Sequence, residues 1–384
     1  MRYDVAVVGA GPAGSTTAFH LARSGLRVAL LERESLPRYK TCGGGLVGRA
    51  LRWLPVPVDP AAERVCREIV VGLVPRHLAF SYRRPYPLIT MTMRSALDAL
   101  LARSAEAAGA DLLAPCELRG LEEAGDGVRL DTSRGPLRAD FVVGADGATG
   151  VVARSGGWDA RRHAIPAIEI ETWVDDATMA RLGDAARFDF GLPSRGYAWV
   201  FPKASHLSIG VLTTRRGTHD LSGALAAYLA MLDVRPRHVE RHGYVIPTTA
   251  ATGRLVRGRL VAVGDAAGLA DPLTAEGISF AALSGRLAAA ALVEAGLDPA
   301  RTAERYERAV SRHIRPELRA ARVLARVVYG PLPVQLAVYR TVGRRLARVV
   351  ADVAAGNRPW ARALPAAFGR TLQSQLPENS RMPG

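Results

Sequence analysis

The stretch Tyr3–Gly14, YDVAVVGAGPAG, decides the fold of this 384-residue chain. It opens with a short valine-rich run, as expected of a buried parallel strand, and helical spacing of apolar residues follows it. Gly9 permits a tight turn, Gly11 lets the backbone approach a pyrophosphate, and Gly14 allows the helix to pack closely on the strand. Strand, glycine loop and helix together predict a dinucleotide-binding unit.

A second strand is predicted at residues 26–31, and it ends at Glu32, 18 residues after Gly14. A carboxylate at this place can accept hydrogen bonds from ribose hydroxyls. Arg33 follows at the same strand end, and we expect both side chains to contact the dinucleotide. This unit alone does not distinguish FAD from NAD, so the choice depends on motifs further along the chain.

Composition narrows the classes of partner and location. The chain carries a net charge of +15, but no nucleic-acid recognition motif accompanies it, so nucleic acid is excluded as a partner. Its three cysteines are scattered, without Cys-x-x-Cys spacing. This pattern argues against a disulfide framework and a zinc site, so we expect no metal and a reducing, cytoplasmic location. An apolar run long enough to span a membrane is not found.

Two further motifs follow predicted strands: VVGADG at residues 142–147 and LVAVGDAAG at residues 260–268. Each places an acidic residue in a tight turn after an apolar run. Together with the first glycine loop, Arg94 in MTMRSALDALL and the spacing GDAAG-x3-P-x4-GI, they resemble FAD-dependent enzymes of the aromatic-hydroxylase and geranylgeranyl-reductase type. The resemblance runs from residue 2 to about residue 295 and implies that the bound dinucleotide is FAD.

The resemblance also implies roles for individual residues. Asp265 would bind the ribityl chain, Arg94 would lie near the pyrophosphate, and the Pro and Gly-Ile of the last motif would line the flavin ring. Many relatives have serine where this chain has Gly150, and we expect a small local change there with FAD retained. The complete set of expected cofactor contacts is Gly9, Gly11, Pro12, Ala13, Gly14, Glu32, Arg33, Cys42, Gly43, Gly44, Gly45, Arg94, Asp146, Gly147, Gly264, Asp265, Pro272, Gly277 and Ile278.

A second glycine cluster, KTCGGGLVG at residues 40–48, also has the spacing of a dinucleotide loop. The residues before it, RESLPRYK, are charged and contain proline, so they cannot form the central strand that such a loop requires. The segment K-x-C-G-G-G-L resembles the loop that borders the flavin ring in geranylgeranyl reductases. That resemblance makes Cys42 a candidate catalytic proton donor; a small buried residue is the alternative.

The segment GYAWVFPK at residues 196–203 resembles the Y-x-W-x-F-P segment of the same reductases. Read as a strand, it places Tyr197, Trp199 and Phe201 on one face. Three aromatic side chains on one face predict the wall of a pocket for an apolar substrate. Plain core packing is the alternative.

We predict an α/β fold with a Rossmann-like FAD-binding domain, an inserted antiparallel-sheet substrate domain and a helical C-terminal region. The expected boundaries are residues 1–75, 90–160 and 255–300 for the FAD-binding domain, residues 76–89 and 161–254 for the substrate-binding domain, and residues 301–384 for the C-terminal region. A helix is expected at about residues 273–295, after the GDAAG motif.

The resemblance to geranylgeranyl reductases implies an FAD-dependent reductase that saturates carbon–carbon double bonds of a polyprenyl chain of the geranylgeranyl type by hydride transfer from reduced flavin. NAD(P)H or a ferredoxin-like donor would supply the reducing equivalents, because one dinucleotide fold is predicted. The substrate would be a prenyl lipid, quinone or pigment. An FAD-dependent aromatic monooxygenase and a membrane-surface, quinone-linked flavoprotein dehydrogenase are the alternatives.

The C-terminal part is strongly basic, since residues 311–370 contain 12 arginines against two acidic residues, Glu317 and Asp352. Apolar residues interleave with these arginines. A basic amphipathic helix is typical of a surface that binds anionic lipid, which predicts peripheral contact with the inner face of a membrane. Arginines on ordinary solvated helix faces are the alternative.

Overall fold

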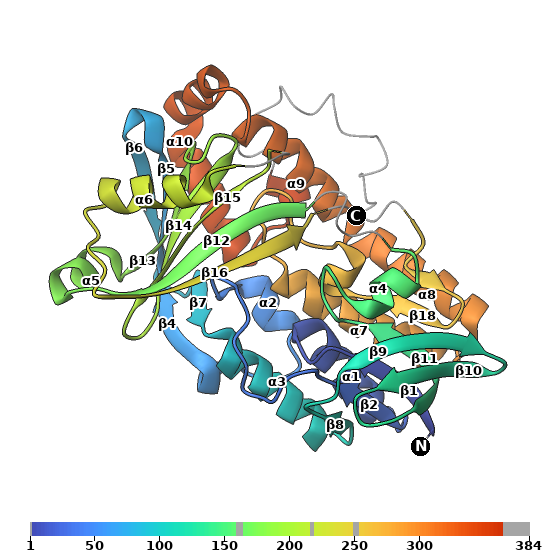
Figure 1. The fold of residues 1–384 in the computed structure, drawn as a ribbon. Helices are drawn as coiled ribbons and strands as arrows, with labels where there is room; N and C mark the ends of the chain where they lie inside the picture. Colours follow the sequence, from blue (N-terminus) through green and yellow to red (C-terminus); the bar gives the residue numbers. More distant parts are fainter. Residues whose placement is uncertain (1, 159–163, 216–218, 249–252, 364–384) are drawn as a thin grey trace.

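The computed structural model describes residues 2–158, 164–215, 219–248 and 253–363. Two large sheets, of eight and seven strands, organise these residues, and a three-stranded sheet accompanies them. Figure 1 shows the two large sheets on opposite sides of the molecule, with the helices α9 (Arg315–Val328) and α10 (Leu332–Ala354) beside the seven-stranded sheet. The predicted α/β class, with a Rossmann-like sheet and a second, largely antiparallel sheet, is confirmed.

The eight-stranded sheet contains the dinucleotide-binding unit. Its strands are β1 (Arg2–Val8), β2 (Val28–Leu31), β8 (Asp111–Leu113), β9 (Leu118–Ala124), β10 (Gly127–Thr132), β11 (Leu137–Gly144), β17 (Val256–Arg257) and β18 (Leu260–Ala262). Strands β2, β1, β11 and β18 run parallel, and Val8 lies opposite both Leu31 and Gly144. Their carboxyl ends therefore form one edge, where the loops that carry the predicted cofactor motifs meet.

Helices pack on this sheet at close range. The helices of this part are α1 (Pro12–Arg23), α2 (Gly48–Trp53), α3 (Arg94–Ala107), α4 (Val151–Ser155) and α7 (Ile278–Glu294). A Cβ atom on Gly285 would lie 2.4 Å from the carbonyl oxygen of Ala13, so α7 packs directly on α1. Helix α7 begins five residues later than expected, because Asp271 Oδ1 accepts hydrogen bonds from the amides of Leu273 and Thr274 and holds them in a turn.

The seven-stranded sheet has two different faces. Its strands, in spatial order, are β16 (His238–Pro247), β12 (Ala164–Trp173), β15 (Leu207–Thr213), β14 (Gly196–Pro202), β13 (Ala185–Phe190), β5 (Glu68–Leu73) and β6 (Leu78–Arg83). One face packs on α6 (Leu221–Met231) through residues such as Ile170 and Val200. The other face carries Ala167, Tyr197 and Trp199, and these pack toward α9 and α10. A short helix, α5 (Asp176–Leu182), connects β12 to β13.

The hairpin β5–β6 contains the domain boundary that was expected at residue 75. In this hairpin Leu73 pairs with Leu78, and β5 also pairs with β13 in the same sheet. Both strands therefore belong to the second sheet, although the sequence placed residues 68–73 with the first domain. The preceding strand, β4 (Ala62–Cys66), instead forms the three-stranded sheet with β3 (Gly45–Val47) and β7 (Ile89–Thr92).

The C-terminal region is helical as far as the structure describes it. Its helices are α8 (Pro299–His313), α9 (Arg315–Val328) and α10 (Leu332–Ala354). Helix α10 packs on β5 and β6, and its buried positions include Leu346 and Val349. Within the described ranges, none of the helices combines the length and apolar character needed to cross a bilayer. Residues 364–384, which complete the expected C-terminal region, lie outside the described residues.

Candidate functional site

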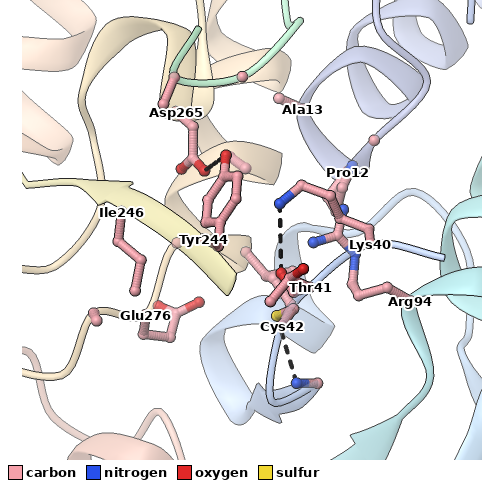
Figure 2. A pocket seen from close by; sticks show the side chains of 18 of the residues that line it. Pro12, Ala13, Lys40, Thr41, Cys42, Arg94, Tyr244, Ile246, Asp265 and Glu276 are labelled. Carbon is pink, nitrogen blue, oxygen red and sulfur yellow. Dashed lines mark hydrogen bonds between the residues drawn. The ribbon is translucent and has the colours of Figure 1, made fainter. Parts of the chain in front are cut away.

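A cavity of about 590 Å³ lies between the carboxyl edge of the eight-stranded sheet and the second sheet. Figure 2 shows how side chains from distant segments converge on it, among them Pro12, Lys40, Cys42, Arg94 and Asp265. The first three come from the N-terminal part of the chain, Arg94 begins α3, and Asp265 follows β18. The parallel register of the first sheet brings Pro12 and Asp265 together, and Arg94 joins them from the end of β7 in the three-stranded sheet.

The first glycine loop forms one end of the cavity with bare backbone. Gly9 has a φ of +103°, and a Cβ atom there would lie 2.5 Å from the carbonyl oxygen of Ala145. A Cβ atom on Gly14 would lie 1.8 Å from the carbonyl oxygen of Gly9, so this glycine serves the packing of α1 and does not line the cavity. Gly11 faces the guanidinium group of Arg94. The loop and an arginine thus frame a place for a phosphate group.

A chain of buried ion pairs runs beside this loop. Glu32 accepts hydrogen bonds from the amide of Ala10 and from Arg38, both at 3.1 Å. Arg38 also donates to Asp98 at 2.9 Å, and Arg94 donates to the same carboxylate through two nitrogens at 2.8 Å. Asp98 therefore holds two arginines in place. Glu32 stands at the end of β2 where it was expected, and Arg33 also lines the cavity.

Asp265, Tyr244 and Lys40 meet at the opposite wall. The Tyr244 hydroxyl donates to Asp265 at 3.2 Å, and the Lys40 ammonium group lies 3.1 Å from the centre of the Tyr244 ring. Burial, and then the charge of Arg94, lower the pKa of Lys40 to about 8. Figure 2 shows the Lys40 side chain extending toward Tyr244. This wall joins polar and aromatic surface, which suits the ribityl chain and ring of a flavin.

The Cys42 loop, defined here as residues 40–45, lies between the first loop and the second sheet. Gly44 has a φ of +66°, and a Cβ atom there would lie 2.0 Å from the carbonyl oxygen of Thr92. A Cβ atom on Gly43 would lie 2.7 Å from the ring of Phe201. Its glycines therefore let the loop pack flat against its neighbours. Residues 33–40, which lie between β2 and the loop, form no strand, as the sequence predicted. Cys42, Gly43, Gly44 and Gly45 all line the cavity.

Three aromatic residues of β14, Tyr197, Trp199 and Phe201, line the same cavity. Their ring centroids lie 6.0 and 6.3 Å apart in succession along the strand. The indole of Trp199 covers Gly210 of the neighbouring strand, where a Cβ atom would lie 2.2 Å from the indole. Its Nε1 atom is buried without a hydrogen-bond partner among the described residues. The role of Tyr197, Trp199 and Phe201 as the wall of a substrate pocket stays a prediction.

The two acidic turns place their residues differently. Asp146 and Gly147 line the cavity, and Asp146 Oδ2 accepts the amide of Val152 at 2.9 Å. A Cβ atom on Gly150 would lie 2.0 Å from the Asp146 carboxyl group, so the chain has glycine there for close packing. Gly277 and Ile278 line the cavity at the start of α7, whereas Gly264 and Pro272 do not. Gly264 instead packs against Ala13.

These features fit FAD. Bare backbone at the glycine loop, the arginine beside it, the carboxylate at the end of β2 and the start of α7 offer partners for phosphates, ribose and ring. The Oδ1 atom of Asp146 is buried without a partner among the described residues, which leaves an acceptor available. In the same ranges, clusters of three or more His, Cys, Asp or Glu side chains that could hold a metal ion are absent.

Comparison with known proteins agrees with this fit. The family model described as "FAD binding domain" matches residues 2–308. The digeranylgeranylglycerophospholipid reductase 2 of Methanothermobacter thermautotrophicus is 32% identical over 340 residues, which cover 80% of this chain and 83% of that protein. This chain belongs to the geranylgeranyl-reductase-like family of FAD-dependent oxidoreductases.

A plant protein and an archaeal protein of known structure are also similar to this flavoprotein. The chloroplastic geranylgeranyl diphosphate reductase of rice (Oryza sativa subsp. japonica) is 31% identical over 358 residues, which cover 85% of this chain and 75% of that protein. The crystal structure of a geranylgeranyl bacteriochlorophyll reductase-like protein from Thermoplasma acidophilum has a TM-score of 0.79 at 21% identity, covering 97% and 98% of the two chains. That structural likeness shows the fold.

Sequence reasoning missed several residues of this flavoprotein's site. Arg38 and Tyr244 make the contacts described above, and Glu169 of β12 lines the cavity and accepts the Cys42 amide at 2.7 Å. The spacing of Arg94 and Asp98, four residues apart in an expected helix, was a readable signal for their ion pair. The partners of Arg38, Tyr244 and Glu169 come from distant segments, and spacing does not reveal them.

Proposed function

We propose that the protein saturates carbon–carbon double bonds of a polyprenyl chain at this cavity. The observation that carries the proposal is the apolar arm, the part of the cavity beyond the Cys42 loop. Aliphatic and aromatic side chains form it: Val47, Ile89, Phe188, Leu212, Val350, Val353 and Ala354. A hydrocarbon chain gains about 0.8 kcal/mol for each methylene group buried on such a surface. The relatives' names, which refer to geranylgeranyl substrates, support the same chemical class.

The chemistry divides between cofactor and chain. Reduced FAD supplies hydride when bound, while the chain must hold the alkene, exclude water and provide a proton. Tyr197 and Trp199 would hold the alkene, and their ring faces are apolar surface on a rigid strand. Cys42 is a candidate proton donor, because it lines the cavity.

The reductant reaches the flavin from outside the chain. NAD(P)H bound transiently at the flavin face, or a ferredoxin-like protein, would supply two electrons per double bond. A rapid-mixing experiment separates the two: NAD(P)H alone bleaches the flavin absorbance in the first case. In the second case bleaching requires the reduced iron–sulfur protein.

Helix α10 supports contact with an anionic membrane. Its exposed side carries Arg340, Arg344, Arg345 and Arg348, whereas Val350 and Val353 near its end line the apolar arm. Each basic residue near an anionic bilayer contributes about 1 kcal/mol of attraction. We therefore expect peripheral binding that weakens with salt. Co-sedimentation with vesicles containing anionic lipid measures it, and binding that neutral vesicles reproduce would contradict it.

The decisive experiment on the proposed function is anaerobic. The FAD-loaded protein is reduced with dithionite and mixed with lipids, quinones and diphosphates that carry geranylgeranyl chains. We expect products that gain two hydrogen atoms for each double bond, as measured by mass spectrometry. Reduction of the same compounds by free reduced FAD provides the baseline.

Two other outcomes would overturn the proposal. Hydroxylation of an aromatic compound with oxygen and NAD(P)H, without any saturated prenyl product, would indicate an aromatic monooxygenase. Electron transfer to the ring of a quinone, with every side-chain double bond intact, would indicate a quinone-linked dehydrogenase.

A further inference from the structure

Two glutamates of β12, Glu169 and Glu171, lie on its cavity-facing side, and each is 1% exposed. We call them the carboxyl pair. Carboxylates are rarely buried this deeply without full compensation. Neither residue was predicted from the sequence, and neither belongs to the FAD contacts described above.

Polar contacts join the carboxyl pair into a continuous chain. His206 Nε2 lies 3.1 Å from Glu171 Oε2. The Tyr39 hydroxyl lies 3.5 Å from Glu171 Oε1 and 3.1 Å from Glu169 Oε1. Glu169 Oε1 also accepts the amide hydrogen of Cys42 at 2.7 Å. A hydroxyl group both donates and accepts, so Tyr39 is able to pass a proton between the two carboxyl groups.

Charge balance indicates that this chain holds a proton. The buried cation beside the pair is Lys203, which is 0% exposed and donates to the carbonyl oxygens of Gly43 and Thr92. With both glutamates ionised, the three side chains carry a net charge of −2 + 1 = −1. One proton held by the pair or by His206 makes the cluster neutral. A buried net charge is far more costly than a neutral cluster, so the neutral form is favoured.

The surroundings set the affinity for this proton. Burial, and then the charge of Glu171, raise the pKa of Glu169 to about 7, against the opposing hydrogen bonds of the Cys42 amide and the Tyr39 hydroxyl. His242 of β16 lies in register with Glu169, and its ring stacks on Tyr39 at 3.9 Å. Several titratable or charged groups face the pair from neighbouring segments. They are Tyr39 and Cys42 at the Cys42 loop, His242 and the exposed Glu240 of β16, and Lys203 and His206 of the β14–β15 turn.

We propose that the carboxyl pair, in place of Cys42, supplies the proton that the alkene takes up in the cavity, and that His206 and Tyr39 return a proton to it. The proposal rests on the proposed function, because alkene reduction consumes one proton per double bond. The alkene gains two electrons and one C–H bond with the hydride from reduced FAD, which is left oxidised. Its other carbon forms a C–H bond with the proton of Glu169, whose O–H bond breaks and leaves a carboxylate. The proton of Glu171 or His206 then restores the acid through Tyr39.

The first test needs no substrate. Infrared spectra of the FAD-loaded protein are recorded between about pH 5 and about pH 9, and the protonated-carboxyl stretch is followed. We expect a band that titrates near neutral pH and is absent in Glu169→Gln, which keeps an oxygen acceptor for the Cys42 amide. The matched control is Glu68→Gln, in the same sheet but paired with Arg83. A band that persists in Glu169→Gln would overturn the proposal.

The second test measures the prenyl step itself. In single turnovers of the pre-reduced protein we expect Glu169→Gln to slow alkene saturation by about 100-fold or more, the range typical of a lost general acid. Rates in the parent protein should fall as pH rises above about 7, and this fall should be absent in the variant. FAD absorbance and flavin reduction should be unchanged in both.

Further variants keep the test decisive. Tyr39→Phe breaks the link inside the pair, so we expect the first turnover to proceed normally and later turnovers to slow. If Glu169→Gln does not retain FAD, Tyr39→Phe and Glu171→Gln carry the same test. Equal pH profiles in all variants and the parent protein would overturn the relay. Absence of prenyl saturation in the parent protein would instead overturn the proposed function, while the infrared titration would still decide whether the pair stores a proton.

Discussion

The ammonium nitrogen of Lys203 lies 2.7 Å from the carbonyl oxygen of Gly43, and this contact ties the seven-stranded sheet to the Cys42 loop. The same nitrogen lies 2.9 Å from the carbonyl oxygen of Thr92. Lys203 is fully buried, and burial lowers its pKa. One side chain therefore satisfies two buried carbonyl groups and fixes the loop beside the flavin-facing part of the cavity.

The variant Lys203→Met should lose about 2–4 kcal/mol of unfolding free energy, because two buried carbonyl groups lose their donor. We also expect weaker FAD retention, since the loop loses its anchor. Lys40→Met is the comparison, because Lys40 donates to one carbonyl group, that of Thr41 at 3.4 Å, and otherwise contacts the Tyr244 ring. Urea unfolding of the apo-proteins measures the loss of unfolding free energy in both variants, and equal losses would contradict the anchoring role of Lys203.

Replacing Gly44 with alanine tests how tightly the loop is packed. Gly25 has a similarly positive φ of +85°, but a Cβ atom there would meet nothing within 4 Å. Gly25→Ala should therefore lose only the left-handed backbone strain, about 1–2 kcal/mol. Gly44→Ala adds the contact with Thr92 and should lose at least about 2 kcal/mol more. Thermal unfolding of the two variants checks this difference, and matching values would mean that the loop moves freely.

Neutralising the buried Asp98 carboxylate should reduce stability and FAD binding far more than neutralising an exposed carboxylate that also pairs with an arginine. Asp98→Asn leaves Arg38 and Arg94 without their shared buried partner, so we expect a loss of about 3 kcal/mol and weaker FAD binding. Asp126 pairs with Arg2 at the surface, where its side chain is 63% exposed. Asp126→Asn should change neither property measurably. Calorimetry and fluorescence titration with FAD measure the two effects.

The apolar arm predicts a chain-length effect. Val353→Trp would fill the arm, so kcat/KM should fall about 10-fold or more for long prenyl chains and less for short ones. FAD binding should remain unchanged. Val334→Trp, on the same helix but at a position that is 43% exposed, is the control. Uniform losses with both substrates in both variants would place the substrate elsewhere.

Glu169 makes stability depend on pH in a defined direction. Its pKa is raised from 4.5 to about 7 by burial and by the charge of Glu171, so the folded protein binds more protons than the unfolded chain between these values. Its contribution to stability therefore falls as pH rises from about 4.5 to about 7 and is constant above. The full change is on the order of 3 kcal/mol. Glu169→Gln should flatten this part of the curve, as denaturant unfolding at a series of pH values would show.

Glycine spacing made the dinucleotide-binding unit predictable, because the backbone contacts behind it leave no room for side chains. Gly9 and Gly14 illustrate this, each with a carbonyl oxygen within 2.5 Å of a Cβ position. A second dinucleotide fold at the Cys42 loop was rejected on a different local ground, because the residues before it are charged and contain proline. In both stretches, residues that are close together in the sequence were enough to predict the local backbone structure.

The carboxyl pair shows what local sequence does not contain. Acidic residues at alternate positions of a strand ordinarily indicate a solvent-facing side. Here the Cys42 loop covers that side, and this covering depends on contacts between residues more than 120 positions apart. The start of α7 was missed for a smaller reason, since a side-chain turn at Asp271 delays the helix.

Gly210 lies behind the indole of Trp199 and does not itself line the cavity. A larger residue at this position would push the indole forward and narrow the space in front of it. The dimensions of the chamber are thus adjustable from behind its wall. Natural variation or laboratory selection at position 210 would alter which molecules fit, without changing any atom that they touch.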